Sequence, residues 1–101
     1  MTNPRVVVIT VNDQANLSNR LIRRIKFLIY KLKEKFDQIV YTDVHIKTEG
    51  HSPASFQLSI IVGLPGKDVV FTTSESEPEN LIKTTYLKLK RILSKKLSRF
   101  D

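Results

Sequence analysis

The sequence contains no cysteine among its 101 residues, which excludes a disulfide scaffold, a thiolate metal site and a cysteine nucleophile. This absence fits a protein that works in the reducing cytosol. Long apolar runs are also missing. The run from Val6 to Val11 has no cleavage-like site after it and is far shorter than the roughly 18 residues of a membrane span. What remains is a small globular chain, and its length predicts one domain, residues 1–101.

Acidic residues are scarce in two segments of the chain, so the charge is unevenly distributed. The formal net charge is +7. Residues 17–36 and 78–101 carry nearly all of the excess positive charge, whereas residues 37–77 carry six acids and only two bases. A surface of one sign attracts partners of the opposite sign. The segregation therefore predicts an anionic partner, with nucleic acid ahead of anionic lipid.

Hydrophobic periodicity predicts the element order β-α-β-β-β-α. The run "RVVVITV" is apolar without alternation, which is typical of a strand buried on both faces or central in a sheet. Residues 39–47, 56–62 and 68–73 are expected to form an antiparallel meander of three strands, with Val40, Val44 and Ile46 facing the core. The fold class is therefore predicted as α/β (α+β), a two-layer structure whose four-stranded sheet carries two helices on one face.

The stretch "RLIRRIKFLIYKLKEKF", residues 20–36, predicts a helix that follows Ser18 as N-cap. A second helix is expected near Pro78, where Ser76 and Glu79 have the spacing of a capping box. A basic amphipathic helix alone is also compatible with a membrane surface or a partner's groove. Here the sheet is expected to cover both apolar stripes. The apolar positions of the two helices are Leu17, Leu21, Ile22, Ile25, Leu28, Ile29, Leu32, Phe36, Leu81, Ile82, Tyr86, Leu89, Ile92, Leu93 and Phe100.

The outward faces of both helices are then expected to lie side by side and to be basic. Such a surface binds phosphates without reading bases. Phe27 and Tyr30 lie on the basic side of the first helix, where they could stack on unpaired bases or pack under a loop. Charge alone nominates as RNA-binding residues Arg20, Arg23, Arg24, Lys31, Lys83, Lys88, Lys90, Arg91, Lys95 and Arg99.

Residues that could carry catalysis or bind a metal are scattered. His45 is expected beside Asp43 on a strand and His51 in a loop, and no third ligand has a suitable spacing. The acids show no paired-carboxylate spacing, and there is no Ser-His-Asp signature or Gly-rich phosphate loop. The "GLPG" of residues 63–66 matches a KH-type loop, but flanking strands favour a hairpin. We expect no enzyme, no cofactor, no metal and no small-molecule substrate.

The whole pattern resembles the short ribosome hibernation-promoting factors, the family that includes ribosome-associated inhibitor A (protein Y). The resemblance runs from about Val6 to Phe100. It rests on the element order, on the apolar residues of the first helix leading into "KFDQI", and on "TDVHI" and "FQLSIIVGLPGKDVV". The sequence departs from the family in the last helix, where "ENLIKTTY" puts Tyr86 at a position that usually carries an acid.

The resemblance implies a cytoplasmic protein that binds the small ribosomal subunit and its 16S rRNA in the channel for messenger and transfer RNA. It also implies a fold similar to double-stranded RNA-binding domains. Lys31, Lys35 and Arg91 fall where the family carries bases, and Lys26 could replace a family lysine lost at Leu28. The chain stops soon after the second helix, so we expect a monomer off the ribosome. Two alternatives stay open: a general RNA-binding domain, and a module that docks an acidic protein or an anionic membrane.

Overall fold

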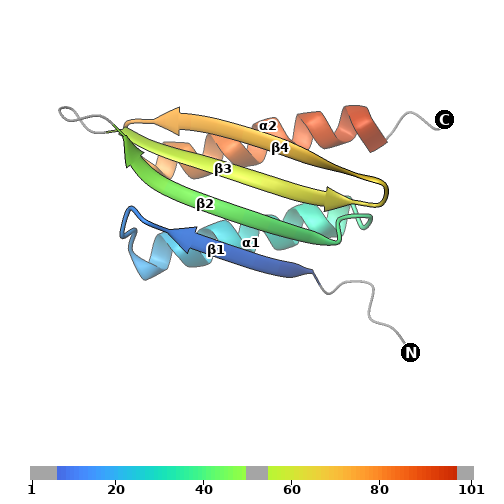
Figure 1. Cartoon of the computed structure of the whole chain (residues 1–101), viewed down its shortest axis with the longest axis horizontal. Coiled ribbons are helices and arrows are strands. Elements are labelled where there is room, and N and C mark those ends of the chain that lie inside the picture. Colours follow the sequence, from blue (N-terminus) through green and yellow to red (C-terminus); the bar gives the residue numbers. More distant parts are fainter. Residues whose placement is uncertain (1–6, 50–54, 98–101) are drawn as a thin grey trace.

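A computed structural model describes residues 7–49 and 55–97. Its elements are β1 (Val8–Asp13), α1 (Asn19–Lys35), β2 (Tyr41–Glu49), β3 (Ser55–Leu64), β4 (Lys67–Glu75) and α2 (Pro78–Leu97). The strands form one sheet in the order β1-β2-β3-β4, and both helices cover the same face of it (Figure 1). The predicted order and the two-layer α+β class are confirmed.

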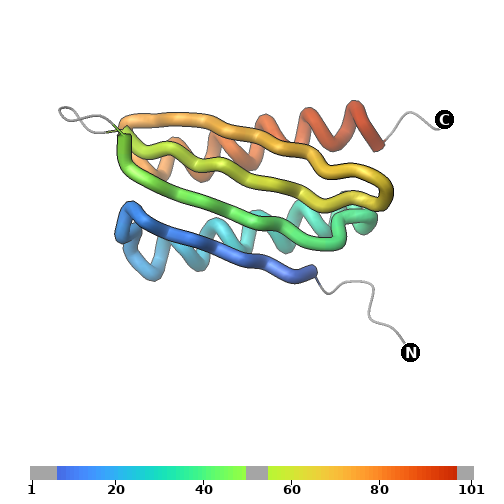
Figure 2. The backbone as a smooth tube through the Cα atoms, in the orientation of Figure 1, coloured from blue at the N-terminus to red at the C-terminus, as the bar shows by residue number. Residues whose placement is uncertain are grey.

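The sheet combines a parallel pair with an antiparallel meander. β1 pairs in parallel with β2 through the crossover that contains α1, while β2, β3 and β4 pair antiparallel as expected. β1 and β4 run in the same direction, and each is followed by a helix that runs back across the sheet. α1 and α2 therefore run in the same direction as each other (Figure 2). The basic segments of the sequence therefore become two parallel neighbours.

The prediction that the first strand is central or buried on both faces was wrong. β1 is an edge strand whose residues alternate between exposed and half-buried, and Val8 is 63% exposed. A single sheet covered on one face has no doubly buried strand, so one side of each strand meets solvent. The unbroken apolar run reflects β propensity rather than burial.

Side-chain hydrogen bonds fix the start of α1. Asp13 accepts from the backbone N–H groups of Ala15 and Leu17 at 2.9 and 2.7 Å, which closes the turn after β1. Ser18 is the N-cap, as predicted, and its Oγ accepts from the Leu21 N–H at 3.3 Å. At α2 the first helical residue is Pro78, and the Glu79 carboxylate accepts from the Arg20 guanidinium.

The end of α1 depends on a buried lysine that the helical pattern did not reveal. Lys33 is only 6% exposed, and its Nζ donates to the backbone carbonyls of Asp37 at 2.6 Å and Ile39 at 2.7 Å. The ammonium satisfies two carbonyls in the connection between α1 and β2. Lys33 is therefore a structural residue rather than part of the basic surface.

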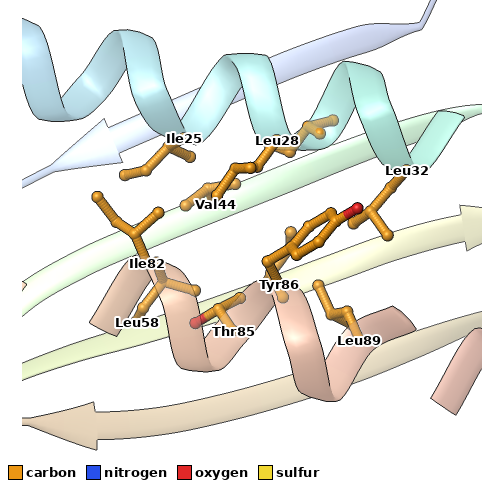
Figure 3. A pocket seen from close by; sticks show the side chains of 11 residues that line it. Ile25, Leu28, Leu32, Val44, Leu58, Ile82, Thr85, Tyr86 and Leu89 are labelled. Atoms are coloured by element: carbon orange, nitrogen blue, oxygen red, sulfur yellow. The ribbon is translucent and has the colours of Figure 1, made fainter. Parts of the chain in front are cut away.

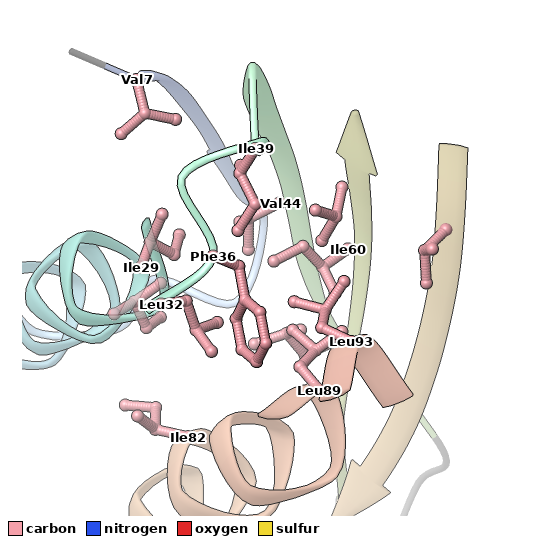
Figure 4. Close-up of a cluster of buried hydrophobic side chains, with 14 of the residues drawn as sticks. Val7, Ile29, Leu32, Phe36, Ile39, Val44, Ile60, Ile82, Leu89 and Leu93 are labelled. Atoms are coloured by element: carbon pink, nitrogen blue, oxygen red, sulfur yellow. The ribbon is translucent and has the colours of Figure 1, made fainter. Parts of the chain in front are cut away.

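The core lies between the helices and the sheet (Figure 4). Figure 4 shows Phe36 at the end of α1 close to Leu89 and Leu93 of α2. Val40 was expected to face the core but lies before β2 and is 56% exposed. Two threonines, Thr42 and Thr85, are also buried, and their hydroxyls have no hydrogen-bond partner among the residues that the structure describes.

The other face of the sheet has no element over it among the described residues (Figure 1). Tyr41 of β2 lies across Gly63 of β3, and its hydroxyl donates to Asp68 Oδ2 of β4 at 2.9 Å. This hydrogen bond to Asp68 raises the pKa of Tyr41 above its usual 10.0, with smaller effects from burial and from the charges of Asp68 and Asp43. A side chain at residue 63 would collide with the Tyr41 ring, so any residue other than glycine there must displace that ring.

Candidate nucleic-acid interface

The outward surfaces of α1 and α2 are strongly basic. Thirteen lysine and arginine residues lie on the two helices, against the acids Glu34 and Glu79. Apart from Lys33, nearly all of these cations reach solvent. The nominated residues that are exposed are Arg20, Arg23, Arg24, Lys26, Lys31, Lys35, Lys83, Lys88, Arg91 and Lys95. Lys90 is half-buried, and Arg99 lies outside the described residues.

Two contacts show which flank of each helix faces the other. The Arg20 guanidinium donates to Glu79 Oε2 at 2.9 Å and forms an ion pair near the N-terminal ends of both helices. Nearer the C-terminal end of α1, Lys31 lies 5.8 Å from the ring centroid of Tyr86, which is near the middle of α2. Because both helices run the same way, residues of α1 and α2 meet in matched order along their common boundary (Figure 2).

With about 100° of rotation per residue, these contacts sort ten of the nominated cations into three groups, while Lys35 ends α1 with its ammonium 5.7 Å from the ring centroid of Phe36. One group flanks the boundary between the helices and will be called the interhelical strip: Arg20, Arg24, Lys31, Lys83 and Lys90. A second group, Arg23 and Lys26, turns toward the β1 side of the molecule with Tyr30. The third, Lys88, Arg91 and Lys95, turns toward the far flank of α2. The sequence predicted one continuous surface, whereas the helical repeat divides it.

The aromatic residues divide in the same way. Phe27 is 61% exposed, and the Lys31 ammonium lies 5.7 Å from its ring centroid. Tyr86 has Lys31 at 5.8 Å and Lys90 at 6.0 Å from its centroid. These spacings lie within the range of cation–π attraction. Tyr30 is 50% exposed on α1, and no lysine or arginine of the described part of the chain lies over its ring.

Tyr86 is the functional candidate that the sequence pattern missed, because its position was assigned to the core. Figure 3 shows its ring reaching from α2 toward α1, above the apolar side chains between the helices. The cavity below it measures only about 20 Å³ and is lined by residues such as Ile25, Ile82 and Thr85. A signal was present in the sequence: an aromatic residue followed four positions later by lysine occurs once in each helix.

The open face of the sheet has the opposite electrostatic character. Asp43, Glu49 and Asp68 lie on it, and Glu49 accepts from the amide of Gln57 at 2.7 Å. His45 lies 3.2 Å from Asp43, as the strand alternation predicted, while His51 lies outside the described residues. Among residues 7–49 and 55–97, no cluster of three His, Asp or Glu side chains could hold a metal ion. The two faces of the molecule therefore carry opposite charge, positive on the helices and negative on the open face of the sheet.

Neither described helix has the length and apolarity required to cross a bilayer. No family model matches the chain, and no curated protein matches it.

The fold does have counterparts among solved structures. A ribosomal subunit interface protein from Coxiella burnetii has a TM-score of 0.74 and 18% identity, over 93% of this chain and 100% of that one. The N-terminal domain of Protein Y from Thermus thermophilus has a TM-score of 0.61 and 16% identity, over 84% of this chain and 98% of that domain. At these identities the likeness shows the fold, and it is the fold that the sequence resemblance implied.

Proposed function

We propose that this chain belongs to the hibernation-promoting factor family and acts as a single cytoplasmic ribosome-binding domain. It binds the small ribosomal subunit through 16S rRNA in the channel for messenger and transfer RNA, and it inhibits translation while the ribosome is idle. The observation that carries the proposal is the interhelical strip, a basic surface on a fold shared with a ribosomal subunit interface protein and Protein Y.

The mechanism is occlusion and requires no covalent chemistry. Positive charge on the helices and negative charge on the sheet orient the chain as it approaches rRNA, which raises the rate of encounter. The strip then neutralises phosphates and releases their counterions. Arg20 is already paired with Glu79, so four strip residues release counterions when they contact phosphates. The logarithm of the binding constant should then fall with the logarithm of salt concentration with a slope of about −2.8 to −3.6.

Co-sedimentation with purified small subunits tests the proposal. We expect saturable binding of one chain per subunit, competition by transfer RNA, and inhibition of translation in a reconstituted system. The double variant Arg24→Glu/Lys31→Glu should abolish binding, because it reverses two adjacent charges of the strip. The matched control is Lys47→Glu/Lys67→Glu, which changes the net charge equally but alters β2 and the β3–β4 hairpin. That control should bind like the parent chain.

Other outcomes identify other functions. Binding to arbitrary duplex RNA with equal affinity, without saturation on small subunits, would indicate a general RNA-binding domain. Equal loss of binding in both double variants would show that only net charge matters and would contradict the role of the strip. Pelleting with anionic vesicles in the absence of ribosome binding would favour a membrane surface.

A further inference from the structure

We infer that the boundary between α1 and α2 holds one unpaired nucleobase of the bound RNA, stacked on Phe27, with its flanking phosphates on Lys31 and Lys90. The inference rests on the proposed function and adds the kind of RNA that the strip selects. The group that carries it is Phe27, Lys31, Tyr86 and Lys90, which will be called the quartet. Its members come from two helices that are far apart in the sequence.

The quartet is held together by three cation–aromatic contacts. Lys31 is shared between Phe27 and Tyr86, and Lys90 lies over Tyr86 from its own helix, four residues on. Tyr86 is half-buried and leans across the boundary (Figure 3), so the core below fixes its position. The lysine ammoniums are thus held beside the rings instead of being spread through solvent.

Phe27 has no evident structural reason to be aromatic. It is 61% exposed, so its substitution costs little core packing. On α2, Leu87 follows Tyr86 directly and is also exposed, at 53%. Large apolar side chains that stay exposed within a charged surface mark places that are covered on binding.

The chemistry of the quartet matches an unpaired base better than a regular duplex. Double-stranded RNA is recognised by shape, 2′-hydroxyls and phosphates, and that mode makes no use of an exposed phenyl ring. Surfaces that bind unpaired nucleotides combine aromatic rings with cations that follow the backbone. Exposed Phe27 supplies the ring face, and the two lysines supply the phosphate contacts. The partner is therefore RNA with an extruded base, such as a bulge or a junction.

Fluorescence offers a direct test because the sequence contains no tryptophan. In the variant Phe27→Trp, the added indole is the only one in the chain. Its emission should be quenched by a short RNA duplex that carries one bulged adenosine. The same duplex with an abasic bulge, at saturating concentration, should leave the emission nearly unchanged. The matched control is Tyr30→Trp, on the same helix but outside the quartet, which should respond equally weakly to both duplexes.

Affinities give a second, independent measurement. The unaltered chain should prefer the bulged duplex over the abasic one by about five-fold to 150-fold, the range expected for stacking one base. Phe27→Ala should lose that preference and keep its affinity for the abasic duplex, while Phe27→Tyr should retain the preference. Equal quenching by both duplexes, or an unchanged preference in Phe27→Ala, would overturn the inference.

The failure of this inference can be told apart from the failure of the proposed function. If small subunits bind the unaltered chain and Phe27→Ala equally well, occlusion stands and base stacking is refuted. If small subunits do not bind while the bulged duplex is still preferred through Phe27, the ribosomal role is refuted and the stacking site stands.

Discussion

Replacing Lys33 by methionine separates a lysine that stabilises the fold from the lysines that bind RNA. The Lys33 ammonium makes two short hydrogen bonds, to the carbonyls of Asp37 and Ile39. Hydrogen bonds from a charged donor contribute about 1.5–3 kcal/mol each. Methionine keeps the apolar stem and removes the cost of burying a charge, so the net loss should be about 2–4 kcal/mol.

That loss is a large part of the 5–15 kcal/mol that stabilises a typical domain. For a chain of this size it corresponds to a fall in Tm of roughly 10–30 °C. Urea unfolding followed by circular dichroism measures it directly. Lys35→Met is the control, because Lys35 is exposed in the same turn of α1.

The functional comparison uses Lys31→Met. This variant should keep the stability of the parent chain and lose affinity for small subunits, whereas folded Lys33→Met should lose stability and keep affinity. If Lys33→Met unfolds at the same urea concentration as Lys35→Met, the two carbonyl contacts do not stabilise the end of α1. If Lys33→Met instead weakens binding while its stability is unchanged, the assignment of Lys33 to the fold is wrong.

Three further predictions concern the sheet and the core. Thr85→Val should raise the free energy of unfolding by about 1 kcal/mol, because it removes a buried hydroxyl that has no partner among the described residues. If calorimetry shows that the variant is less stable than the parent chain, the Thr85 hydroxyl does make a hydrogen bond. Gly63→Ala should lower the free energy of unfolding by about 1–3 kcal/mol, because the added methyl group displaces the Tyr41 ring. A double-mutant cycle in urea should give a smaller loss when Tyr41 is also replaced by alanine. Absorbance titration at high pH should give Tyr41 a pKa above 10.0 that returns toward 10.0 in Asp68→Asn. Because the folded state holds this proton more tightly, the contribution to stability is present below pH 10 and is lost as the pH rises through the raised pKa.

The sequence was sufficient for the arrangement of the elements. Periodicities of two and of three to four residues distinguish strands from helices, and short connections make β2, β3 and β4 antiparallel neighbours. Ser18 and the "GLPG" hairpin also followed from local chemistry, and the structure confirms both, with Gly66 at a φ of 87°. Such features depend on neighbours in the chain.

Features that depend on distant partners were harder to predict. β1 carries a run of apolar residues typical of a central strand. It lies at the edge because β2 already pairs with β3 on its other side, and no further strand is left to pair with β1 among the described residues. The burial of Lys33 could not be predicted from the helix, because nothing in its sequence shows that the carbonyls of Asp37 and Ile39 will accept hydrogen bonds from its ammonium. To predict the interhelical strip and the role of Tyr86, one must know which flank of each helix faces the other, and only the packed structure shows this.

The Arg20–Glu79 ion pair gives the free protein an internal competitor for RNA. The Glu79 carboxylate occupies a place on Arg20 that a phosphate would take, and both side chains are open to solvent, so the exchange is easy. At this position one anion replaces another and no counterion is released to the solvent. Arg20 should therefore contribute little to the salt dependence of binding, in contrast to Lys31, and Glu79→Gln should make the free chain less selective for strongly anionic targets.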